Sequence, residues 1–179
     1  MIKFEVTRDP RLLQSYYALR EQSFREELNI PNFDGSEEES DRQGHILIAR
    51  QGNECLGGVR ISQRLSAKEH LDELDLPQET CCIWERFTLA PTVRRMDVGR
   101  DLIAALVETS HVLGYHHAMV LSSLRCARLY RLVHHAIGHT FEIHRTVPEC
   151  AQGAFAGLEH YLSISHLSKA EAPALTLVA

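Results

Sequence analysis

The second half of the sequence alternates between strand-like and helix-like segments, and this alternation constrains the fold more than any other feature. The apolar periodicity predicts, in order, a central strand at Cys81–Leu89, a helix over about Val98–Leu113, a buried strand at Ala118–Ser122, a helix over about Leu124–Ala136 and a strand over about Thr140–Thr146. Strands that alternate with helices in this way build a sheet covered by helices. We therefore expect a mixed α/β fold.

The first half of the sequence predicts a helix and a hairpin. The helix is expected over about Arg11–Leu28, because Asp9 suits the N-cap and Pro10 suits the first helical position. Residues 29–41 are expected to form a loop. The other predicted elements are a hairpin of His45–Ala49 and Cys55–Ile61, a short helix from the Ser66-x-x-Glu69 capping box to about Leu74, and a final strand at Tyr161–Ser165.

Length, charge and cysteine content narrow the class of protein. The 179 residues fit one domain, expected over residues 1–168, with an Ala- and Pro-rich tail at 169–179 that we expect to be mobile. The net charge of −5 argues against nucleic acid as a partner, and no apolar run suits a signal peptide or a membrane span. The five cysteines show no C-x-x-C pair, so we expect reduced thiols and a cytoplasmic location. The sequence does not indicate an oligomeric state.

The histidines raise the question of a metal site. His135 and His139 have the spacing of two ligands on one helix face, but Gly138 lies between them and is expected to end that helix. Neither a cysteine nor a carboxylate completes a ligand set. We therefore expect no metal.

A basic turn follows the predicted central strand. The strand ends at Pro91, and Arg94, Arg95 and Arg100 surround the start of the helix that begins near Val98. The first turn of a helix has unsatisfied N–H groups and a partial positive charge, which together bind phosphate oxygens. The turn therefore predicts a pyrophosphate cradle, and the alternative is a solvated basic turn.

The same segment resembles the coenzyme A signature of GNAT acyltransferases, P-x-x-[RQ]-x-x-G-x-[GA], through the run Pro91-x-x-Arg94-x-x-Asp97-x-Gly99-Arg100. The preceding Arg86-Phe87-Thr88-Leu89 resembles the bulged fourth strand of that family. The resemblance implies a single GNAT-like domain with a central mixed, mostly antiparallel sheet. It also implies an N-acyltransferase that moves an acyl group from acetyl-CoA or acyl-CoA to a primary amine of a small molecule or peptide. Asp97 replaces the usual first glycine, and its carboxylate would disfavour a nearby phosphate.

The front half resembles a branch of the same fold that contains acyl-homoserine-lactone (autoinducer) synthases and N-acyl amino acid synthases. The matching runs are Arg20-x-x-x-Phe24, Glu38-x-x-Asp41, Gly44 to Ala49, and Gly57-Gly58-Val59-Arg60, although the tryptophan usual in that branch is missing between Phe24 and Asp41. The resemblance implies that Arg20, Phe24 and Arg60 bind substrate and that acyl carrier protein can be the donor. The alternatives are surface ion pairs for the two arginines and a solvated face for residues 37–41.

The implied reaction requires an oxyanion donor, a base and an acid. The resemblance places the backbone N–H donor within Phe87–Leu89. Glu85 is the candidate base, and strand alternation predicts that Glu85 and Arg86 point to opposite faces. Tyr130 and His134, four residues apart on one helix face, are the candidate acids. For each of these side chains the alternative is a structural role. A non-catalytic acyl-CoA-binding domain is the third functional reading.

Overall fold

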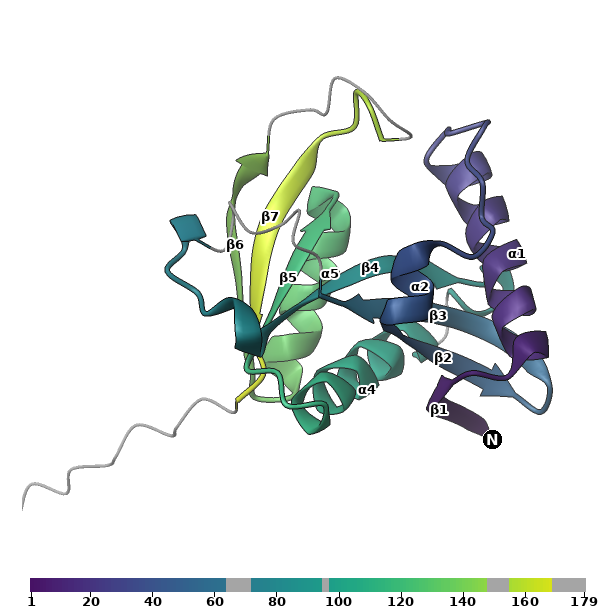
Figure 1. The fold of residues 1–179 in the computed structure, drawn as a ribbon, viewed down its shortest axis with the longest axis horizontal. Helices are drawn as coiled ribbons and strands as arrows, with labels where there is room; N and C mark the ends of the chain where they lie inside the picture. The colour runs from purple at the N-terminus through teal and green to yellow at the C-terminus, as the bar shows by residue number, and fades with distance from the viewer. Residues whose placement is uncertain (64–71, 95–96, 148–154, 169–179) are drawn as a thin grey trace, which may run out of the picture.

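The computed structural model describes residues 1–63, 72–94, 97–147 and 155–168, which form one seven-stranded sheet flanked by helices (Figure 1). The strand order is β1-β2-β3-β4-β5-β7-β6. Neighbouring strands are antiparallel except for β4 and β5, which are parallel. The strands are β1 (Ile2–Thr7), β2 (His45–Gln51), β3 (Glu54–Ser62), β4 (Cys81–Leu89), β5 (His117–Ser122), β6 (Thr140–Val147) and β7 (His160–His166). The expected mixed, mostly antiparallel sheet is confirmed.

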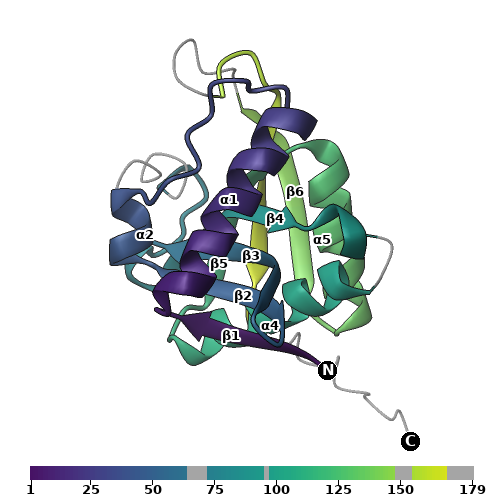
Figure 2. The same cartoon turned by 90° about the vertical axis from the view of Figure 1, so that its right-hand side faces the viewer.

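Helices cover both faces of this sheet. The helices are α1 (Pro10–Glu27), α2 (Glu39–Gln43), α4 (Val98–Val112) and α5 (Leu124–Ala136). Figures 1 and 2 show α1 and α2 on one side of the β2–β4 region and α4 on the other side. Alternation along β2 explains the two layers, because Ile46 and Ile48 pack against α1 whereas Leu47 and Ala49 belong to the cluster that includes α4.

Most predicted elements are confirmed. The predicted N-cap of α1 is correct, because the Asp9 carboxylate accepts a hydrogen bond from the Arg11 N–H at 2.8 Å. The hairpin is β2 and β3, and the alternating second half is β4, α4, β5, α5 and β6. The predicted final strand is β7. Most of the predicted helix at residues 66–74, and the whole tail at residues 169–179, lie outside the described residues.

Two features of the front half were not predicted. The first is β1, which pairs with β2 at the edge of the sheet. The second is α2, so the expected loop at residues 29–41 is wrong at its end. Glu38 and Asp41 form a reciprocal capping box there, because each carboxylate accepts a hydrogen bond from the other residue's backbone N–H. The last residues of the predicted loop are therefore helical.

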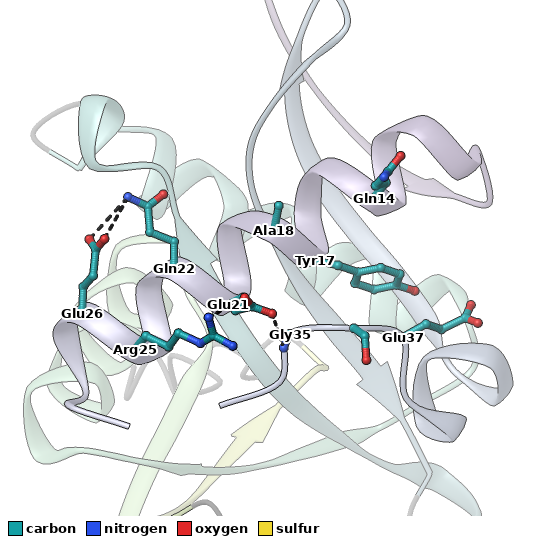
Figure 3. Close-up of a pocket in the computed structure, with 10 residues that line it drawn as sticks. Gln14, Tyr17, Ala18, Glu21, Gln22, Arg25, Glu26, Gly35 and Glu37 are labelled. Atoms are coloured by element: carbon teal, nitrogen blue, oxygen red, sulfur yellow. Dashed lines mark hydrogen bonds and ion pairs between the residues drawn. The ribbon is translucent and has the colours of Figure 1, made fainter. Parts of the chain in front are cut away.

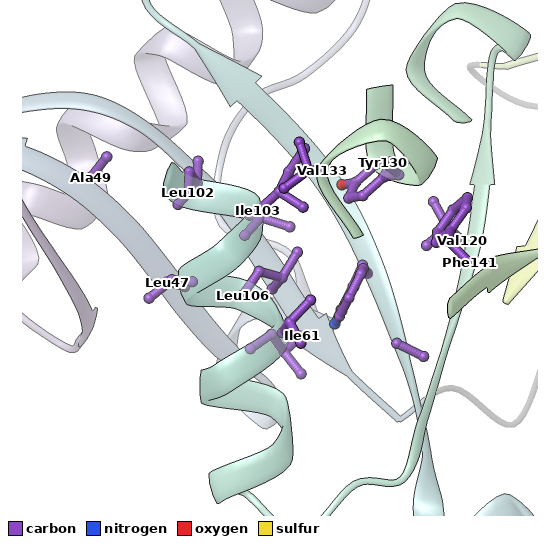
Figure 4. Packing of buried hydrophobic residues seen from close by; sticks show 14 of the residues in the cluster. Leu47, Ala49, Ile61, Leu102, Ile103, Leu106, Val120, Tyr130, Val133 and Phe141 are labelled. Atoms are coloured by element: carbon purple, nitrogen blue, oxygen red, sulfur yellow. The ribbon is translucent and has the colours of Figure 1, made fainter. Parts of the chain in front are cut away.

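The main hydrophobic core lies between the sheet and the pair α4 and α5 (Figure 4). Leu102, Ile103 and Leu106 of α4 are fully buried against this face. Trp84 of β4 is also buried there, and its indole N–H donates to the Ser110 hydroxyl at 2.9 Å. This packing holds α4 against the sheet beside β4, and the turn between these two elements is where the sequence predicts a phosphate cradle.

The strand pairing opens in the middle of the sheet. The parallel register of β4 and β5 runs only from Cys81↔His117 to Trp84↔Val120. Beyond Trp84, β4 continues to Leu89 while the end of β5 stays paired with β7, and the two strands diverge (Figure 1). We call the region between β4 residues 85–89 and β5 residues 121–122 the β4–β5 opening.

Candidate functional site

A β-bulge in β4 begins the candidate site. Gly58 pairs with Thr88 and Arg60 pairs with Glu85, so β4 has one residue more than β3 over this stretch. Arg86 absorbs the extra residue with a φ of 60°, a conformation that non-glycine residues rarely adopt. The Tyr16 hydroxyl of α1 donates to the Arg86 carbonyl at 2.9 Å and holds the bulge from the α1 side. The bulge that the family resemblance implied is confirmed.

Alternation along β4, counted from Ala90, places two backbone N–H groups on the side of the opening. The Ala90 N–H donates to the Leu56 carbonyl of β3 at 2.8 Å. Because successive N–H groups of a strand point to opposite sides, those of Leu89 and Phe87 point away from β3. The β4–β5 opening lies on that side, where no paired strand takes up these donors. Backbone N–H groups in this position can donate hydrogen bonds to a carbonyl oxygen or an oxyanion.

A buried ionic network lies on the α1–α2 face of the opening. Asp41 accepts hydrogen bonds from Arg20 at 3.1 Å and from Arg60 at 3.0 Å. Arg60 also donates to Glu85 at 2.9 Å. Glu38 accepts from Arg60 and, at 2.7 Å, from Arg86. We call these six residues, three arginines and three carboxylates, the charge network.

The structure excludes the surface reading of the two predicted arginines. The side chains of Arg20, Arg60 and Asp41 are all 0% exposed. Glu37 and Glu39 do form exposed pairs with Arg42, so the solvated reading holds for those two residues. Burying charges costs much free energy unless each charge is paired, as the network's charges are here.

The prediction that Glu85 and Arg86 point to opposite faces is wrong. Glu85 pairs with Arg60, Arg86 pairs with Glu38, and Glu38 also pairs with Arg60. Both side chains therefore end in the same network on the α1–α2 face. The physical reason is the bulge, because an extra residue interrupts the side-chain alternation of the strand.

Three phenylalanine rings surround the guanidinium of Arg86. The centre of the guanidinium lies 5.8 Å from the ring centroid of Phe24, 5.4 Å from that of Phe33 and 4.8 Å from that of Phe155. Phe24 lies on α1, Phe33 on the loop after it, and Phe155 on the segment before β7. We call these three rings the phenylalanine cage. It joins the front and back halves of the molecule beside the opening.

An aromatic stack lies on the opposite face of the opening. Tyr130 of α5 is fully buried, and its ring centroid lies 5.8 Å from Trp84, 5.7 Å from Phe87 and 5.5 Å from Phe141. Burial raises the pKa of the Tyr130 hydroxyl well above its usual value. Tyr130 therefore remains a protonated hydroxyl at neutral pH.

His134 is buried one turn further along α5. Its Nδ1 lies 2.7 Å from the Tyr130 carbonyl, which can only accept, so Nδ1 carries the proton and Nε2 accepts from the Ser165 hydroxyl at 2.7 Å. Burial lowers the pKa of His134 to about 4. Both nitrogens of the neutral ring are thus used within the fold.

The start of α4, where the sequence predicts a phosphate cradle, has no side-chain cap from Asp97. The first N–H groups of α4 are therefore not taken up by this side chain. Asp97 instead lies 3.3 Å from Arg100, which offsets part of its negative charge. Arg94 folds back onto the Leu89 carbonyl and Glu27. A diphosphate contact from Arg94 would require this side chain to leave Glu27, and Arg95 lies outside the described residues.

Close packing accounts for the glycine of the predicted signature. A Cβ atom on Gly99 would lie 2.9 Å from a methyl carbon of Leu89, a contact that would force the side chain to shift. Val98 beside it is buried. Gly99 and Val98 therefore seat the helix against β4, and phosphate contacts from these residues would come from their backbone.

A surface groove lies apart from these residues. This groove of about 580 Å³ runs along the outer face of α1, between Tyr17, Glu21 and Arg25 and the loop at Gly35–Glu37 (Figure 3). Figure 3 shows the Glu21 carboxylate directed at the Gly35 N–H, with which it is bonded at 3.0 Å. Neither Glu85 nor Tyr130 lines this groove, so we do not place the chemistry there.

Sequence reasoning assigned no role to several residues of the site. Ser62 donates to Glu85 at 2.9 Å, and it could have been found because it lies two residues after Arg60 and so on the same strand face. The direction of the Arg86 side chain could not be predicted, because the bulge interrupts the alternation of β4 at this residue. Phe33 and Phe155 lie in irregular segments that carry no periodicity. Only the folded chain brings them to Arg86.

Comparisons with known proteins support the fold. Among the described residues, no helix has the length and hydropathy to cross a membrane. The fold resembles the acyl-homoserine-lactone synthase LasI (TM-score 0.69, 14% identity, covering 94% of this chain and 91% of LasI). It also resembles the CoA-dependent acyl-homoserine lactone synthase BjaI (0.68, 19%, 94% and 83%) and a Bacillus subtilis acetyltransferase in complex with CoA (0.61, 11%, 93% and 99%). No curated protein sequence matches the chain.

The family itself is shown by sequence. A profile of the acetyltransferase (GNAT) family matches residues 12–134, a span that runs from α1 through β4 and α4 to α5. This span contains the bulge, both faces of the opening and the start of α4. The chain therefore belongs to the GNAT acetyltransferase family.

Proposed function

We propose that this protein is an N-acyltransferase that moves an acyl group from a coenzyme A thioester to the primary amine of a small molecule or peptide. One observation carries the proposal. Beyond Trp84, the edge of β4 that carries the N–H groups of Phe87 and Leu89 is not paired with β5, and Tyr130 packs on Phe87 beside it. This arrangement supports a donor with its diphosphate at α4 and its thioester in the β4–β5 opening.

The proposed reaction forms a C–N bond and breaks a C–S bond. The amine nitrogen attacks the thioester carbonyl, whose oxygen gains negative charge that the Phe87 or Leu89 N–H stabilises. The carbonyl re-forms as the thiolate leaves, and the thiolate takes a proton from an acid. The amine loses a proton to a base. Orientation of the two substrates supplies much of the acceleration.

Glu85 remains the proposed base. Its side chain is 16% exposed, and one of its carboxylate oxygens accepts from Arg60 and Ser62, both at 2.9 Å. These contacts fix the carboxylate at the bulge, next to the N–H groups that receive the thioester. The amine proton would reach Glu85 directly or through a water.

Tyr130 is the better supported of the two proposed acids. It is protonated at neutral pH because burial raises its pKa, and its ring packs on Phe87 at the opening. His134 has its single ring proton on Nδ1, bonded to the Tyr130 carbonyl. We therefore propose that Tyr130 protonates the leaving thiolate and that His134 holds the helix turn on which Tyr130 lies.

A second candidate function is supported by the charge network. Arg20, Asp41 and Arg60, which carry the resemblance to acyl-homoserine-lactone and N-acyl amino acid synthases, meet in contact with Glu85. In such an enzyme the donor would carry a longer acyl chain on coenzyme A or acyl carrier protein. The fold of this chain, which resembles those of LasI and BjaI, is compatible with this second function. A non-catalytic acyl-CoA-binding domain is the third candidate.

Thiol release from a series of acyl-CoA donors, C2 to C12, tests these candidates against a panel of amines and free amino acids. A buried methylene contributes about 0.8 kcal/mol, so even partial burial of a C8 chain improves donor affinity at least about tenfold over acetyl. We expect a flat series, which identifies a short-chain acyltransferase. A rising series would favour the synthase. Donor binding without thiol release would indicate a binding domain.

A further inference from the structure

The ion pair of Arg86 and Glu38 lies at the outer edge of the charge network, and Arg86 makes fewer hydrogen bonds than the other two arginines. Arg20, Arg60 and Asp41 are 0% exposed, whereas Glu38 is 28% and Arg86 is 13% exposed. Arg20 and Arg60 each make several hydrogen bonds to carboxylates or carbonyls. Arg86 makes one, from Nη2 to Glu38, and its buried Nε has no hydrogen-bond partner among the described residues.

The phenylalanine cage supplies the rest of the Arg86 environment. Its three rings lie within 6 Å of the guanidinium, and the rings of Phe24 and Phe33 stack at 4.6 Å. Aromatic faces together with one carboxylate are the groups with which proteins recognise organic cations. The cage and Glu38 therefore form a cation site, and the cation that fills it belongs to the chain itself.

The position of this site connects it with the reaction. Arg86 directly precedes Phe87, whose N–H group faces the opening, and Phe155 brings the segment before β7 to the same place. Arg86 reaches the cage as a flexible side chain from a strand, so its guanidinium can turn out without any change in the sheet. The network would then hold two cations and three carboxylates and would lack one positive charge.

We infer that the phenylalanine cage and Glu38 recognise a second, charged nitrogen of the amine acceptor, and that Arg86 occupies this site in the free protein. The inference rests on the proposed N-acyltransferase function. The reacting amine must be neutral to attack the thioester, so the group in the cage must be a different one. The acceptor class is a primary amine that also bears a guanidinium or a second ammonium group.

Glu38 suits this role as a permanent anion. Burial tends to raise its pKa, but hydrogen bonds and charges from Arg60 and Arg86 outweigh burial and lower the pKa to about 2. A carboxylate with such a pKa is a poor base at neutral pH and a good partner for a cation. This separates Glu38 from Glu85, which we propose as the base.

The first test needs no activity. Arg86→Ala should empty the cage, and methylguanidinium at ten times its Kd should then raise the melting temperature by about 4 °C. Methylurea, which has nearly the same shape and no charge, should not. The wild-type protein, in which methylguanidinium must first displace Arg86, should respond more weakly than Arg86→Ala at the same concentration. An equal response of Arg86→Ala to both compounds would overturn the inference.

The second test uses the wild-type protein and covers the case in which Arg86→Ala does not fold. Agmatine has a primary amine and a guanidinium, and N-carbamoylputrescine replaces that guanidinium with a neutral urea. Transfer from acetyl-CoA should show a KM at least about tenfold lower for agmatine, and Phe33→Leu should reduce that ratio. Transfer to both amines with equal KM would overturn the cation site while leaving the acyltransferase intact. A response of Arg86→Ala to methylguanidinium, with no acyl transfer to either amine, would support the cation site and overturn the acyltransferase function.

Discussion

The two faces of the β4–β5 opening differ in chemistry, because one consists of charged side chains and the other of aromatic side chains. On the α1–α2 face, six charged side chains form one network, and three of them are fully buried. On the α4–α5 face, Trp84, Phe87 and Tyr130 form an aromatic stack continuous with the main core. Apolar burial stabilises a fold at about 25 cal/mol per Å², whereas buried ion pairs contribute little net stability.

We propose that this difference separates the face that supports the fold from the face that selects a ligand. A hydrophobic replacement of the charge network would leave the fold as stable or more so. We therefore interpret the network as the acceptor side of the reaction and the aromatic stack as the donor side. The following predictions test that division, from the largest effect to the smallest.

Removal of Asp41 should give the largest loss of stability. Asp41→Ala leaves Arg20 and Arg60 buried with an unbalanced charge, which costs about 3–5 kcal/mol. Glu39→Ala, the matched control on the same helix, removes only exposed contacts with Arg42 and Gln43 and should cost less than about 1 kcal/mol. Urea unfolding measures both. Similar losses for the two variants would show that the network is not held by its buried charges.

Acid should weaken the protein through His134 on the aromatic face. Burial lowers its folded-state pKa from 6.5 to about 4, so the unfolded chain binds the extra proton first. Stability from this residue is complete above pH 6.5 and falls as the pH drops toward 4, by about 3 kcal/mol in total. The urea midpoint should fall across this window, and His134→Gln should flatten the fall. An unchanged slope in that variant would contradict a neutral His134.

Tyr130→Phe should reduce turnover without disturbing the stack. The ring remains between Trp84, Phe87 and Phe141, but the proton for the leaving thiolate is lost. We expect kcat to fall about 100-fold with the donor KM unchanged, because a positioned acid contributes about 10²–10⁴-fold. Tyr17→Phe on the outer face of α1 is the control. A wild-type kcat for Tyr130→Phe would remove Tyr130 from the chemistry.

Arg94→Ala should weaken donor binding more than it lowers turnover. A phosphate contact far from the reacting carbonyl binds the substrate and the transition state alike, so the donor KM should rise about tenfold while kcat stays nearly constant. Asp97→Gly serves as the opposite change, because it removes a negative charge from the same turn and should tighten coenzyme A binding. A large fall in kcat for Arg94→Ala would mean that this side chain does not bind phosphate.

Local sequence patterns predicted much of the fold. They did not predict which side chains of the site contact one another. Helix caps such as Asp9 and strand periodicity such as that of β4 are properties of neighbouring residues, so they are readable from the chain. The family signature likewise marked the bulge and the turn at α4. The opposite-face prediction for Glu85 and Arg86 failed, because a bulge changes the pattern by one residue.

The ion pairs of the charge network could not be predicted from local sequence patterns. Arg20 and Arg60 were proposed to bind substrate from their resemblance to one branch of the family, but nothing local showed that Asp41 would pair with both. The cage around Arg86 unites residues 24, 33 and 155, which are brought together only by the packing of α1 against the segment before β7. Long-range contacts of this kind have no period in the sequence.

Hydrogen exchange of the backbone N–H groups, with and without saturating acetyl-CoA, tests the central claim most directly. The claim is that the β4–β5 opening and the start of α4 bind the donor. We expect the N–H groups of Phe87, Leu89 and Gly99 to exchange at least about tenfold more slowly with acetyl-CoA present, because the bound molecule would accept hydrogen bonds from them and shield them from water. The groove along α1, at Gly35–Glu37, should be unchanged. Protection of that groove, with none at Phe87 and Leu89, would contradict the account.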